Sequence, residues 1–235
     1  MIIIPTCLPS KELLDLVDSL IRTNKILTKD LLIIDDHSNE SLSKKIFSIL
    51  KEKKINILNN DGIKGKGAAI KLGINYANSI GANYVLVVDS DGQHHFSDIL
   101  NILNLGKKEN KFIIGSRNFN SNVPIRNRYG NKLSSFLYFL MTKFKIRDCQ
   151  CGLRYIPKKY FQILINTKLN NFDFEMYSLF KIMQTDNILQ ENIKTIYSKE
   201  NYTTNFRIVI DSFKIILVFI KIFIRIKKES KKINT

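Results

Sequence analysis

The sequence predicts an α/β fold, with a mostly parallel, Rossmann-like sheet sandwiched between helices. In the first half of the chain, short apolar runs rich in β-branched residues alternate with amphipathic stretches. Gly, Asn, Asp or Pro bound these apolar runs, which is typical of buried strands. Strands and helices that alternate at this spacing form βαβ units, whose functional residues lie just past the carboxyl ends of the strands.

The individual elements follow from the same patterns. Strands are predicted at residues 1–4, 31–34, 55–58, 84–88 and 112–114 and, in the less regular second half, at 153–156 and 193–197. Helices are predicted at 13–21 after an N-cap at Ser10, and at 68–77, 99–105, 133–144 and 174–183. We expect one catalytic domain over residues 1–201 and an apolar, basic tail over 202–235, since domains typically hold about 100–200 residues.

The composition of the 235-residue chain is that of a globular protein with a strong positive charge. Lys and Arg number 37 against 21 Asp and Glu, which gives a net charge of +16. Nucleic acid, an anionic membrane surface and a compositional bias toward Lys are three interpretations that only the placement of the charges separates. Three cysteines are too few for a disulfide framework, and the opening residues do not resemble a signal peptide, so a reduced cytoplasm is expected.

Polar residues follow three of the predicted strands, where a core would exclude them. The strand at 84–88 runs into Asp89, Ser90 and Asp91. Two carboxylates at i and i+2 on a turn can share a hard divalent cation, and Mg²⁺ or Mn²⁺ held there would bridge a diphosphate. A solvated turn is the alternative, but the apolar strand before the pair and the polar ends of two neighbouring strands favour a metal site.

The other two strand ends and a glycine-rich loop offer further polar groups. Asp36 is placed to accept a hydrogen bond from a base or ribose, or alternatively to form a turn or helix cap. The guanidinium of Arg117 suits a phosphate, because its planar fork bonds two oxygens. The loop 62–67, which contains Lys66, leads into a helix whose N-terminal amides favour an anion, although its glycines equally suit a tight turn.

Together these motifs resemble glycosyltransferase family 2, in particular its polyprenyl/dolichyl-phosphate sugar synthase-like branch. The resemblance covers about residues 1–213, with matching order and spacing throughout. The segments that carry it are IIPT (3–6), IDDHS (34–38), GKGAA (65–69), DSDGQH (89–94), GSR (115–117), VPIRNRYGNK (123–132), DCQCGLRYIP (148–157) and FDFEM (172–176).

The resemblance implies a GT-A fold with a nucleotide-sugar half and an acceptor half. Carried onto this sequence, it places Mg²⁺ or Mn²⁺ on Asp89 and Asp91, with Gln93 beside them. It assigns the binding of a nucleoside-diphosphate sugar to Pro5, Cys7, Asp36, Lys66, Asp89, Ser90, Asp91 and Arg117. The chain departs from the family at Cys7, Leu8 and Pro9, where Tyr-Asn-Glu is usual, so an aromatic residue that often stacks near the base is missing.

The acceptor determines which catalytic groups are needed. A lipid monophosphate, with a second pKa of about 6, is already a dianion at neutral pH, so it needs cationic positioning rather than a base. Arg126, Arg128 and Arg154 are candidates for the acceptor phosphate, because with Arg117 they place half of the eight Arg inside the motifs. A saccharide hydroxyl would instead need a base, and Glu175 is the best candidate, unless it is only a helix-start carboxylate. Asp91, Arg117 and Glu175 are the expected catalytic residues.

The tail is long enough to cross a bilayer but carries a charged stripe. Of the 21 residues 206–226, 15 are apolar, and as a helix they would span about 31 Å. The charges at 207, 211, 214, 221 and 225 fall within an arc of roughly 80°, which suits a helix lying in the membrane interface better than a span. Lysines at 227, 228, 231 and 232 would then contact anionic headgroups. A core helix with one solvated face and a self-association surface are the alternatives.

The sequence thus predicts a divalent-metal-dependent, inverting hexosyltransferase, bound peripherally to the cytoplasmic side of the cell membrane. We expect transfer from a nucleoside-diphosphate sugar to a polyprenyl phosphate in cell-envelope glycan biosynthesis. A transferase that adds the sugar to a saccharide acceptor of a surface glycan is the alternative. Besides these substrates, the expected partners are an anionic membrane surface, through residues 206–235, and a second copy of the chain or an integral membrane protein. Nucleic acid is not expected, because the motifs lack basic residues interleaved with an aromatic platform.

Overall fold

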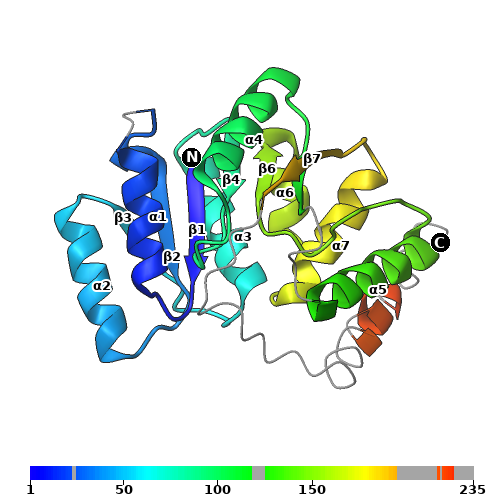
Figure 1. Ribbon diagram of the computed structural model, residues 1–235, viewed down its shortest axis with the longest axis horizontal. Coiled ribbons are helices and arrows are strands. Elements are labelled where there is room, and N and C mark those ends of the chain that lie inside the picture. Colours follow the sequence, from blue (N-terminus) through cyan, green and yellow to red (C-terminus); the bar gives the residue numbers. More distant parts are fainter. Residues whose placement is uncertain (23–24, 118–124, 195–215, 218, 225–235) are drawn as a thin grey trace.

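The computed structural model of the chain describes residues 1–22, 25–117, 125–194, 216–217 and 219–224, and of residues 125–127 the backbone alone. A seven-stranded sheet runs through the centre of the described part (Figure 1). Its strands are β1 (Ile2–Thr6), β2 (Leu31–Asp35), β3 (Asn56–Asn59), β4 (Tyr84–Val87), β5 (Ile113–Arg117), β6 (Arg154–Pro157) and β7 (Leu189–Ile193). Their order is β3-β2-β1-β4-β6-β5-β7, and every pair is parallel except the two that β6 makes.

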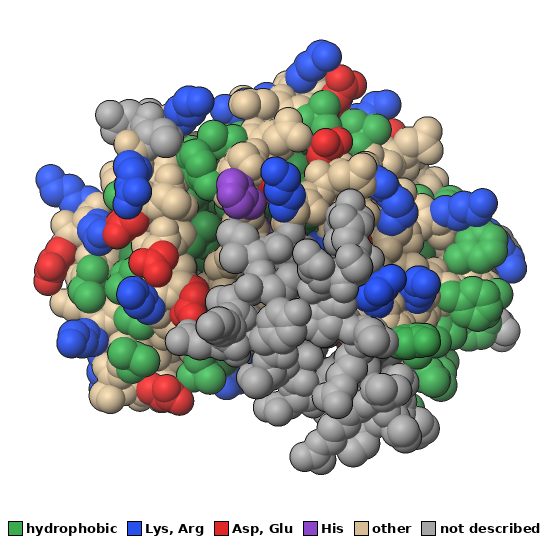
Figure 2. Space-filling view, viewed as in Figure 1, with side chains coloured by type: hydrophobic (Ala, Val, Ile, Leu, Met, Phe, Trp, Pro, Cys, Tyr) green, Lys and Arg blue, Asp and Glu red, His purple; other side chains and the backbone are tan. Residues whose placement is uncertain are grey.

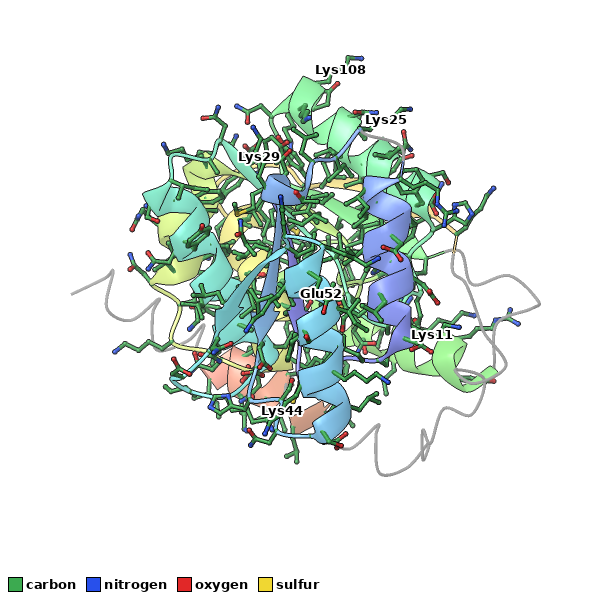
Figure 3. The ribbon with its side chains drawn as sticks, turned by 90° about the vertical axis from the view of Figure 1, so that its left-hand side faces the viewer. Lys11, Lys25, Lys29, Lys44, Glu52 and Lys108 are labelled. Atoms are coloured by element: carbon green, nitrogen blue, oxygen red, sulfur yellow. The ribbon has the colours of Figure 1, made fainter. Side chains whose placement is uncertain are left out.

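Helices cover both faces of this sheet. They are α1 (Lys11–Ile21), α2 (Ser41–Glu52), α3 (Lys66–Ser79), α4 (Phe96–Glu109), α5 (Ile125–Thr142), α6 (Phe161–Ile165) and α7 (Phe172–Met183). Helix α1 contacts α2 and α4, whereas α3 contacts α6 and α7. Figure 3 shows α1 and α3 on opposite sides of the strands. The predicted sandwich of helices around a mostly parallel sheet is therefore confirmed.

The hydrophobic pattern explains this arrangement. All five residues of β1 are buried, as are the first four of β2, because helices cover both faces of these strands. On α1, Leu13, Leu16, Val17 and Leu20 are buried at the spacing that puts one helix face against the sheet. Burial of this apolar surface is the main term that stabilises the two helical layers.

Several elements differ from the sequence-based expectation: α2 and α6 were not predicted, and two predicted elements are shifted along the chain. The strand predicted at 193–197 lies too late, because β7 ends at Ile193. Most side chains of β7 are polar and only partly buried, since β7 forms the edge of the sheet, so no apolar run marked it. The helix predicted at 133–144 begins earlier, at Ile125, in a polar segment that the apolar pattern did not include.

The sheet opens at the carboxyl ends of its central strands. Strand β1 pairs with β2 along its whole length but with β4 only through Ile2 and Ile3. The order of the strands also reverses here, since β2 and β3 lie on one side of β1 and β4 on the other. Ligands of open α/β sheets bind at such a switch point, so the residues after β1 and β4 are placed for binding.

Only a short piece of the predicted tail is described, and it is helical at 216–217 and 219–224. Phe219 and Ile222 are buried there, whereas Ile216, Leu217 and Ile220 are exposed. The boundary at 201/202, and all charged positions of the predicted stripe except Lys221, lie outside the described residues. Among the described helices, none combines the length and the apolar character needed to span a membrane.

Candidate active site

A cavity of about 740 Å³, here called the strand-end cavity, opens at the carboxyl edge of the sheet. It is bordered by the ends of β1, β2, β4 and β5 and by the N-termini of α3 and α7. Its lining residues are Pro5, Thr6, Cys7, Asp36, Lys64, Gly65, Lys66, Asp89, Ser90, Asp91, Arg117, Cys149, Gln150, Asn171, Phe172, Glu175 and Met176. Every residue that the sequence suggested for nucleotide-sugar binding is among them.

Lys66, at the start of α3, contacts two carboxylates of this cavity. Its Nζ atom lies 2.6 Å from Oδ1 of Asp89 and 3.2 Å from Oε1 of Glu175. Burial acts to lower the pKa of Lys66, but the charges of Asp89 and Glu175 outweigh it, so the pKa is raised. Lys66 is therefore a permanent cation within the cavity at all physiological pH values.

The two carboxylates of the Asp-x-Asp pair have opposite pKa shifts. Burial acts to raise the pKa of Asp89, but Lys66 and the neighbouring His94 hold it well below its usual range. His94 is buried, with Nε2 3.7 Å from Oδ2 of Asp89. Desolvation and the charge of Asp89 raise the pKa of Asp91. Titratable groups with such divergent environments cluster at functional sites.

The donor atoms suit a hard divalent cation completed by substrate. Asp89 and Asp91 offer carboxylate oxygens, and Mg²⁺ is typically held by one or two carboxylates together with substrate phosphates. Within the described residues, no group of three or more His, Cys, Asp and Glu side chains is placed to hold a metal ion. Gln93 does not line the cavity, and its backbone N–H donates to Oδ1 of Asp91 at 3.0 Å. Asp89 and Asp91 are thus the protein ligands that the geometry offers.

Asp36 connects the end of β2 to the loop before α3. Its carboxylate accepts hydrogen bonds from the backbone N–H of Gly65, at 2.9 Å, and from Nδ2 of Asn60, at 2.7 Å. Gly65 has φ +145°, and a Cβ atom there would collide with the backbone of Asn170. Both observations favour the turn-forming interpretation of the glycines, while Asp36 itself borders the strand-end cavity.

A second cavity of about 460 Å³, here called the basic cavity, shares Arg117 with the first. It is lined by Ser116, Arg117, Arg128, Asn131, Lys132, Arg147 and Asn192. The buried carboxylate of Asp148 accepts from Nε and Nη2 of Arg117, at 2.6 and 3.0 Å, and so orients the guanidinium. Because four cationic side chains and no carboxylate line it, the basic cavity suits an anionic group.

Arg154, on β6, lies in the protein interior and lines neither cavity. It is 2% exposed, and its guanidinium donates to the carbonyl oxygens of Cys149, Cys151 and Glu175 at 2.6–3.0 Å. The expectation that Arg154 holds an acceptor phosphate is therefore corrected, since its donors are committed to backbone carbonyls. Arg128 lines the basic cavity, and the side chain of Arg126 lies outside the described residues.

Glu175 and Cys149 are two further reactive groups at the strand-end cavity. Glu175 is buried, with its Oε1 3.2 Å from Lys66 and 3.9 Å from the guanidinium of Arg154, so it lies between two cations. Burial raises the pKa of the Cys149 thiol to about 12. The Cys149 side chain is therefore present as the thiol at neutral pH and is not placed to act as a thiolate nucleophile.

Comparison with known proteins assigns the chain to a family. Residues 1–164 match the sequence model of Glycosyl transferase family 2. The chain belongs to glycosyltransferase family 2. It is 28% identical, over 91% of its length, to the UDP-N-acetylglucosamine–dolichyl-phosphate N-acetylglucosaminyltransferase of Methanococcus voltae, of which the match covers 92%. It is 29% identical to an uncharacterized protein of Methanocaldococcus jannaschii, over 83% of this chain and 82% of that one.

Solved structures show the same fold at much lower identity. Glucosyl-3-phosphoglycerate synthase from Mycobacterium tuberculosis, crystallised with Mn²⁺, UDP and phosphoglyceric acid, superposes with a TM-score of 0.68. The identity is 13%, over 94% of this chain and 77% of that one. The predicted GT-A fold is thereby confirmed, and the name of the M. voltae relative agrees with the branch that the motifs resemble.

Several cavity residues of the glycosyltransferase escaped the sequence-based search, among them Lys132, Arg147 and Phe172. Lys132 and Arg147 line the basic cavity, and Arg147, one of only eight Arg, directly precedes the Asp148 motif, so the same scarcity of Arg could have identified it. Phe172 lines the strand-end cavity with 67% of its surface exposed, and Nζ of Lys66 lies 5.8 Å from the centre of its ring. An aromatic ring therefore reaches this cavity from α7, although β1 supplies none.

Proposed function

We propose that this glycosyltransferase moves a hexosyl group from a nucleoside-diphosphate sugar to the phosphate of a polyprenyl phosphate, with inversion at the anomeric carbon. The observation that carries this proposal is the pair of adjoining cavities that share Arg117. One holds an acidic pair and a lysine, as a metal-bound diphosphate requires, and the other is lined by basic side chains without a carboxylate. The name of the M. voltae relative, which gives a dolichyl phosphate as acceptor, supports the same assignment.

On the donor side, Asp89 and Asp91 would hold Mg²⁺ or Mn²⁺. Such a cation stabilises the negative charge that develops on a departing diphosphate. Lys66 adds a fixed positive charge next to the carboxylate of Asp89. Arg117 lies where the strand-end cavity borders the basic cavity. Pro5, Cys7, Asp36 and Ser90 line the space left for the nucleotide and the sugar.

On the acceptor side, Arg128, Lys132 and Arg147 would hold the phosphate. A phosphate oxygen attacks the anomeric carbon while the bond from that carbon to the diphosphate breaks, and the nucleoside diphosphate leaves. With a second pKa of about 6, the acceptor phosphate is mostly dianionic at pH 7, so the step requires no proton transfer. Positioning two anions against their repulsion is then the main task of the protein, and the cationic side chains perform it.

A saccharide acceptor is the second candidate, and Glu175 is the residue that favours it. A hydroxyl nucleophile needs a general base. Two carboxylates at the strand-end cavity lie outside the Asp-x-Asp pair, and since Asp36 accepts hydrogen bonds from Gly65 and Asn60, Glu175 is the candidate. If the acceptor is a saccharide, Glu175→Gln should reduce kcat by about 100-fold or more. With a phosphate acceptor, the same change should have a much smaller effect, because the nucleophile carries no proton to remove.

We further propose that the enzyme binds the cytoplasmic face of the cell membrane through residues 206–235. The apolar and basic composition of this segment supports the proposal. Deletion of 206–235 should weaken binding of the enzyme to anionic vesicles, and a truncated protein that binds them as tightly as the full-length enzyme would contradict the assignment. Light scattering of the intact enzyme would test the proposed homo-oligomer.

The function is tested by offering a donor panel together with competing acceptors. UDP-glucose, UDP-N-acetylglucosamine, UDP-galactose and GDP-mannose, radiolabelled in the sugar, are each incubated with a short-chain polyprenyl phosphate and Mg²⁺ or Mn²⁺. Label should enter the lipid phase with at least one donor, and chelation of the metal should stop it. Asp91→Ala should reduce transfer by about 100-fold or more. Transfer to an oligosaccharide but never to the lipid would overturn the acceptor assignment.

A further inference from the structure

Helix α5 carries an exposed stripe that is apolar and basic. Tyr129, Phe136 and Leu140 are 64%, 57% and 47% exposed, and Lys132 is exposed between them. Their spacing of three, four and four residues places all four on one face of the helix. Single exposed apolar residues are ordinary, but three on one helical stripe mark an interaction surface.

The opposite face of α5 accounts for the position of this stripe. Asn131, Ser134 and Tyr138 are buried, and they hold the helix on the domain. Nδ2 of Asn131 donates to the carbonyl oxygen of Arg147 at 2.9 Å, which fixes the helix beside the basic cavity. The stripe is therefore presented outward by a helix whose inner face is fully used.

The charge around the stripe identifies its partner. Helix α5 contains no Asp or Glu. Lys132 lies within the stripe, and the exposed Lys143 and Lys145 follow directly after the end of the helix. Figure 2 shows hydrophobic side chains gathered over α5 with basic side chains beside them. An apolar strip flanked by cations and free of anions complements the interface of a bilayer that contains anionic lipids.

We propose that the outer face of α5 docks the enzyme on an anionic phospholipid bilayer, independently of the tail. The functional role of this docking rests on the proposed function, which assigns the basic cavity to the acceptor phosphate. Lys132 connects the two, because it belongs both to the stripe and to the basic cavity. A polyprenyl phosphate lying in that bilayer would present its headgroup to the basic cavity without leaving the membrane. Docking by α5 thus places the acceptor site at the lipid surface.

Vesicle sedimentation of the full-length protein tests the proposal. The test variant is Phe136→Ser with Leu140→Ser, both outside the two cavities. The matched control is Leu42→Ser with Ile80→Ser, because these residues, on α2 and at the end of α3, are 55% and 54% exposed. Figure 1 shows α2 at the side of the molecule away from α5. Vesicles of phosphatidylcholine are compared with vesicles that also contain phosphatidylglycerol.

The expected result is preferential binding of the wild type to the anionic vesicles. The α5 variant should bind them at least about 10-fold more weakly, the control variant should bind like the wild type, and added salt should weaken the wild type. Equal binding by the α5 and control variants would overturn the proposal. So would a loss of self-association by the α5 variant with unchanged vesicle binding, since a second copy would then be the partner.

A separate assay distinguishes failure of this inference from failure of the proposed function. Transfer to a water-soluble, short-chain acceptor phosphate is measured without vesicles, where the α5 variant should match the wild type. Lys143→Glu with Lys145→Glu should reduce vesicle binding without affecting this transfer, whereas Lys44→Glu on α2 should alter neither. Intact vesicle binding without any transfer would refute the catalytic assignment and leave α5 docking supported.

Discussion

The backbone of Gly152 lies directly against the carboxylate of Asp89. A Cβ atom at position 152 would overlap Cγ and both carboxylate oxygens of Asp89, at distances that real atoms do not adopt. The loop that carries Gly152 is itself fixed by Arg154, which donates to the carbonyl oxygens of Cys149 and Cys151. The first carboxylate of the Asp-x-Asp pair therefore rests against a rigid backbone wall on one side and against Lys66 on the other.

Gly152→Ala should displace Asp89 and weaken metal binding. The short side chain of Asp89 cannot move aside without leaving its position next to Lys66. A displacement of about 1 Å of a catalytic group can cost about 100-fold in rate, and we expect a loss of this order in transfer together with weaker Mn²⁺ affinity. Electron paramagnetic resonance of free Mn²⁺ measures the affinity directly.

Gly106→Ala is the matched control for this substitution. A Cβ atom there would overlap the ring of Tyr155, which lines neither cavity. This variant should lower the melting temperature while the folded fraction keeps the Mn²⁺ affinity of the wild type. Unchanged Mn²⁺ affinity in Gly152→Ala would show that Gly152 does not position Asp89.

Lys66→Met should destabilise the enzyme and, at the same time, increase the stabilisation that Mn²⁺ provides. The substitution leaves Asp89 and Glu175 without their shared counter-ion. Removing one partner of a fully buried ion pair typically lowers the free energy of unfolding by about 3–5 kcal/mol. We expect a smaller loss here because the side chains of Lys66 and Asp89 are both partly exposed. A divalent cation can take over the role of the ammonium, so Mn²⁺ should raise the melting temperature of Lys66→Met more than that of the wild type.

The pH dependence of this effect follows from the two pKa shifts. The pKa of Lys66 is raised in the folded protein. Its contribution to the free energy of unfolding is therefore complete below the ordinary pKa of 10.5 and is lost as the pH rises through the raised pKa. The pKa of Asp89 is lowered, so its contribution is complete above 3.8 and is lost as the pH falls through the lowered value. The loss of unfolding free energy caused by Lys66→Met should thus be largest between the ordinary pKa values of 3.8 and 10.5, and should become smaller at more acidic and more alkaline pH.

Lys53→Met provides the comparison for a surface ion pair. Lys53 pairs with Asp18, and both side chains are about one-third exposed. Lys53→Met should therefore lower the free energy of unfolding by at most about 1 kcal/mol. Mn²⁺ should not compensate for it. Equal effects of Mn²⁺ on the wild type and on Lys66→Met would contradict the proposed competition between ammonium and metal.

Arg154→Lys and Arg128→Lys should have opposite signatures. A lysine at position 154 cannot reach three separate carbonyl oxygens, so the free energy of unfolding should fall by about 3 kcal/mol while the KM for the acceptor stays unchanged. Arg128→Lys should raise the KM for the acceptor phosphate with little change in stability, because Arg128 lines the basic cavity and does not lie in the hydrophobic core. Urea unfolding and steady-state kinetics of both variants separate these outcomes, and the reverse pattern would restore the phosphate role of Arg154.

Phe172→Ala should weaken binding of the donor. An exposed ring at the strand-end cavity can stack on a base or a sugar, and such contacts are worth about 0.5–1.5 kcal/mol, or about 2- to 12-fold in affinity. Phe172→Tyr keeps the ring and should retain the KM of the wild type for the donor. Equal KM values for Phe172→Ala and the wild type would exclude a stacking role.

The sequence determined the layers of the fold because apolar periodicity reports burial. The runs that became β1, β2, β4 and β5 are buried on both faces, and buried strands of this kind are continuous in sequence. Helix α2 was not predicted although Ile46 and Leu50 are buried on one of its faces, and β7 is an edge strand with mostly polar residues. A polar edge strand is stabilised by pairing with its neighbour, which the pattern of a single segment does not contain.

The sequence also determined which residues meet in the strand-end cavity, since the carboxyl ends of parallel strands share one edge of the sheet. It did not determine the roles of its arginines. Arg128 and Arg154 occur in similar motif settings, yet one lines a cavity and the other is buried. The tertiary structure made this difference. Strand β6 lies between β4 and β5 with helices over the sheet, so the side chain of Arg154 is enclosed. Helix α5, in contrast, places Arg128 beside the basic cavity. Residue type fixes the charge and hydrogen-bonding capacity of a side chain, but only packing fixes the partners that satisfy them.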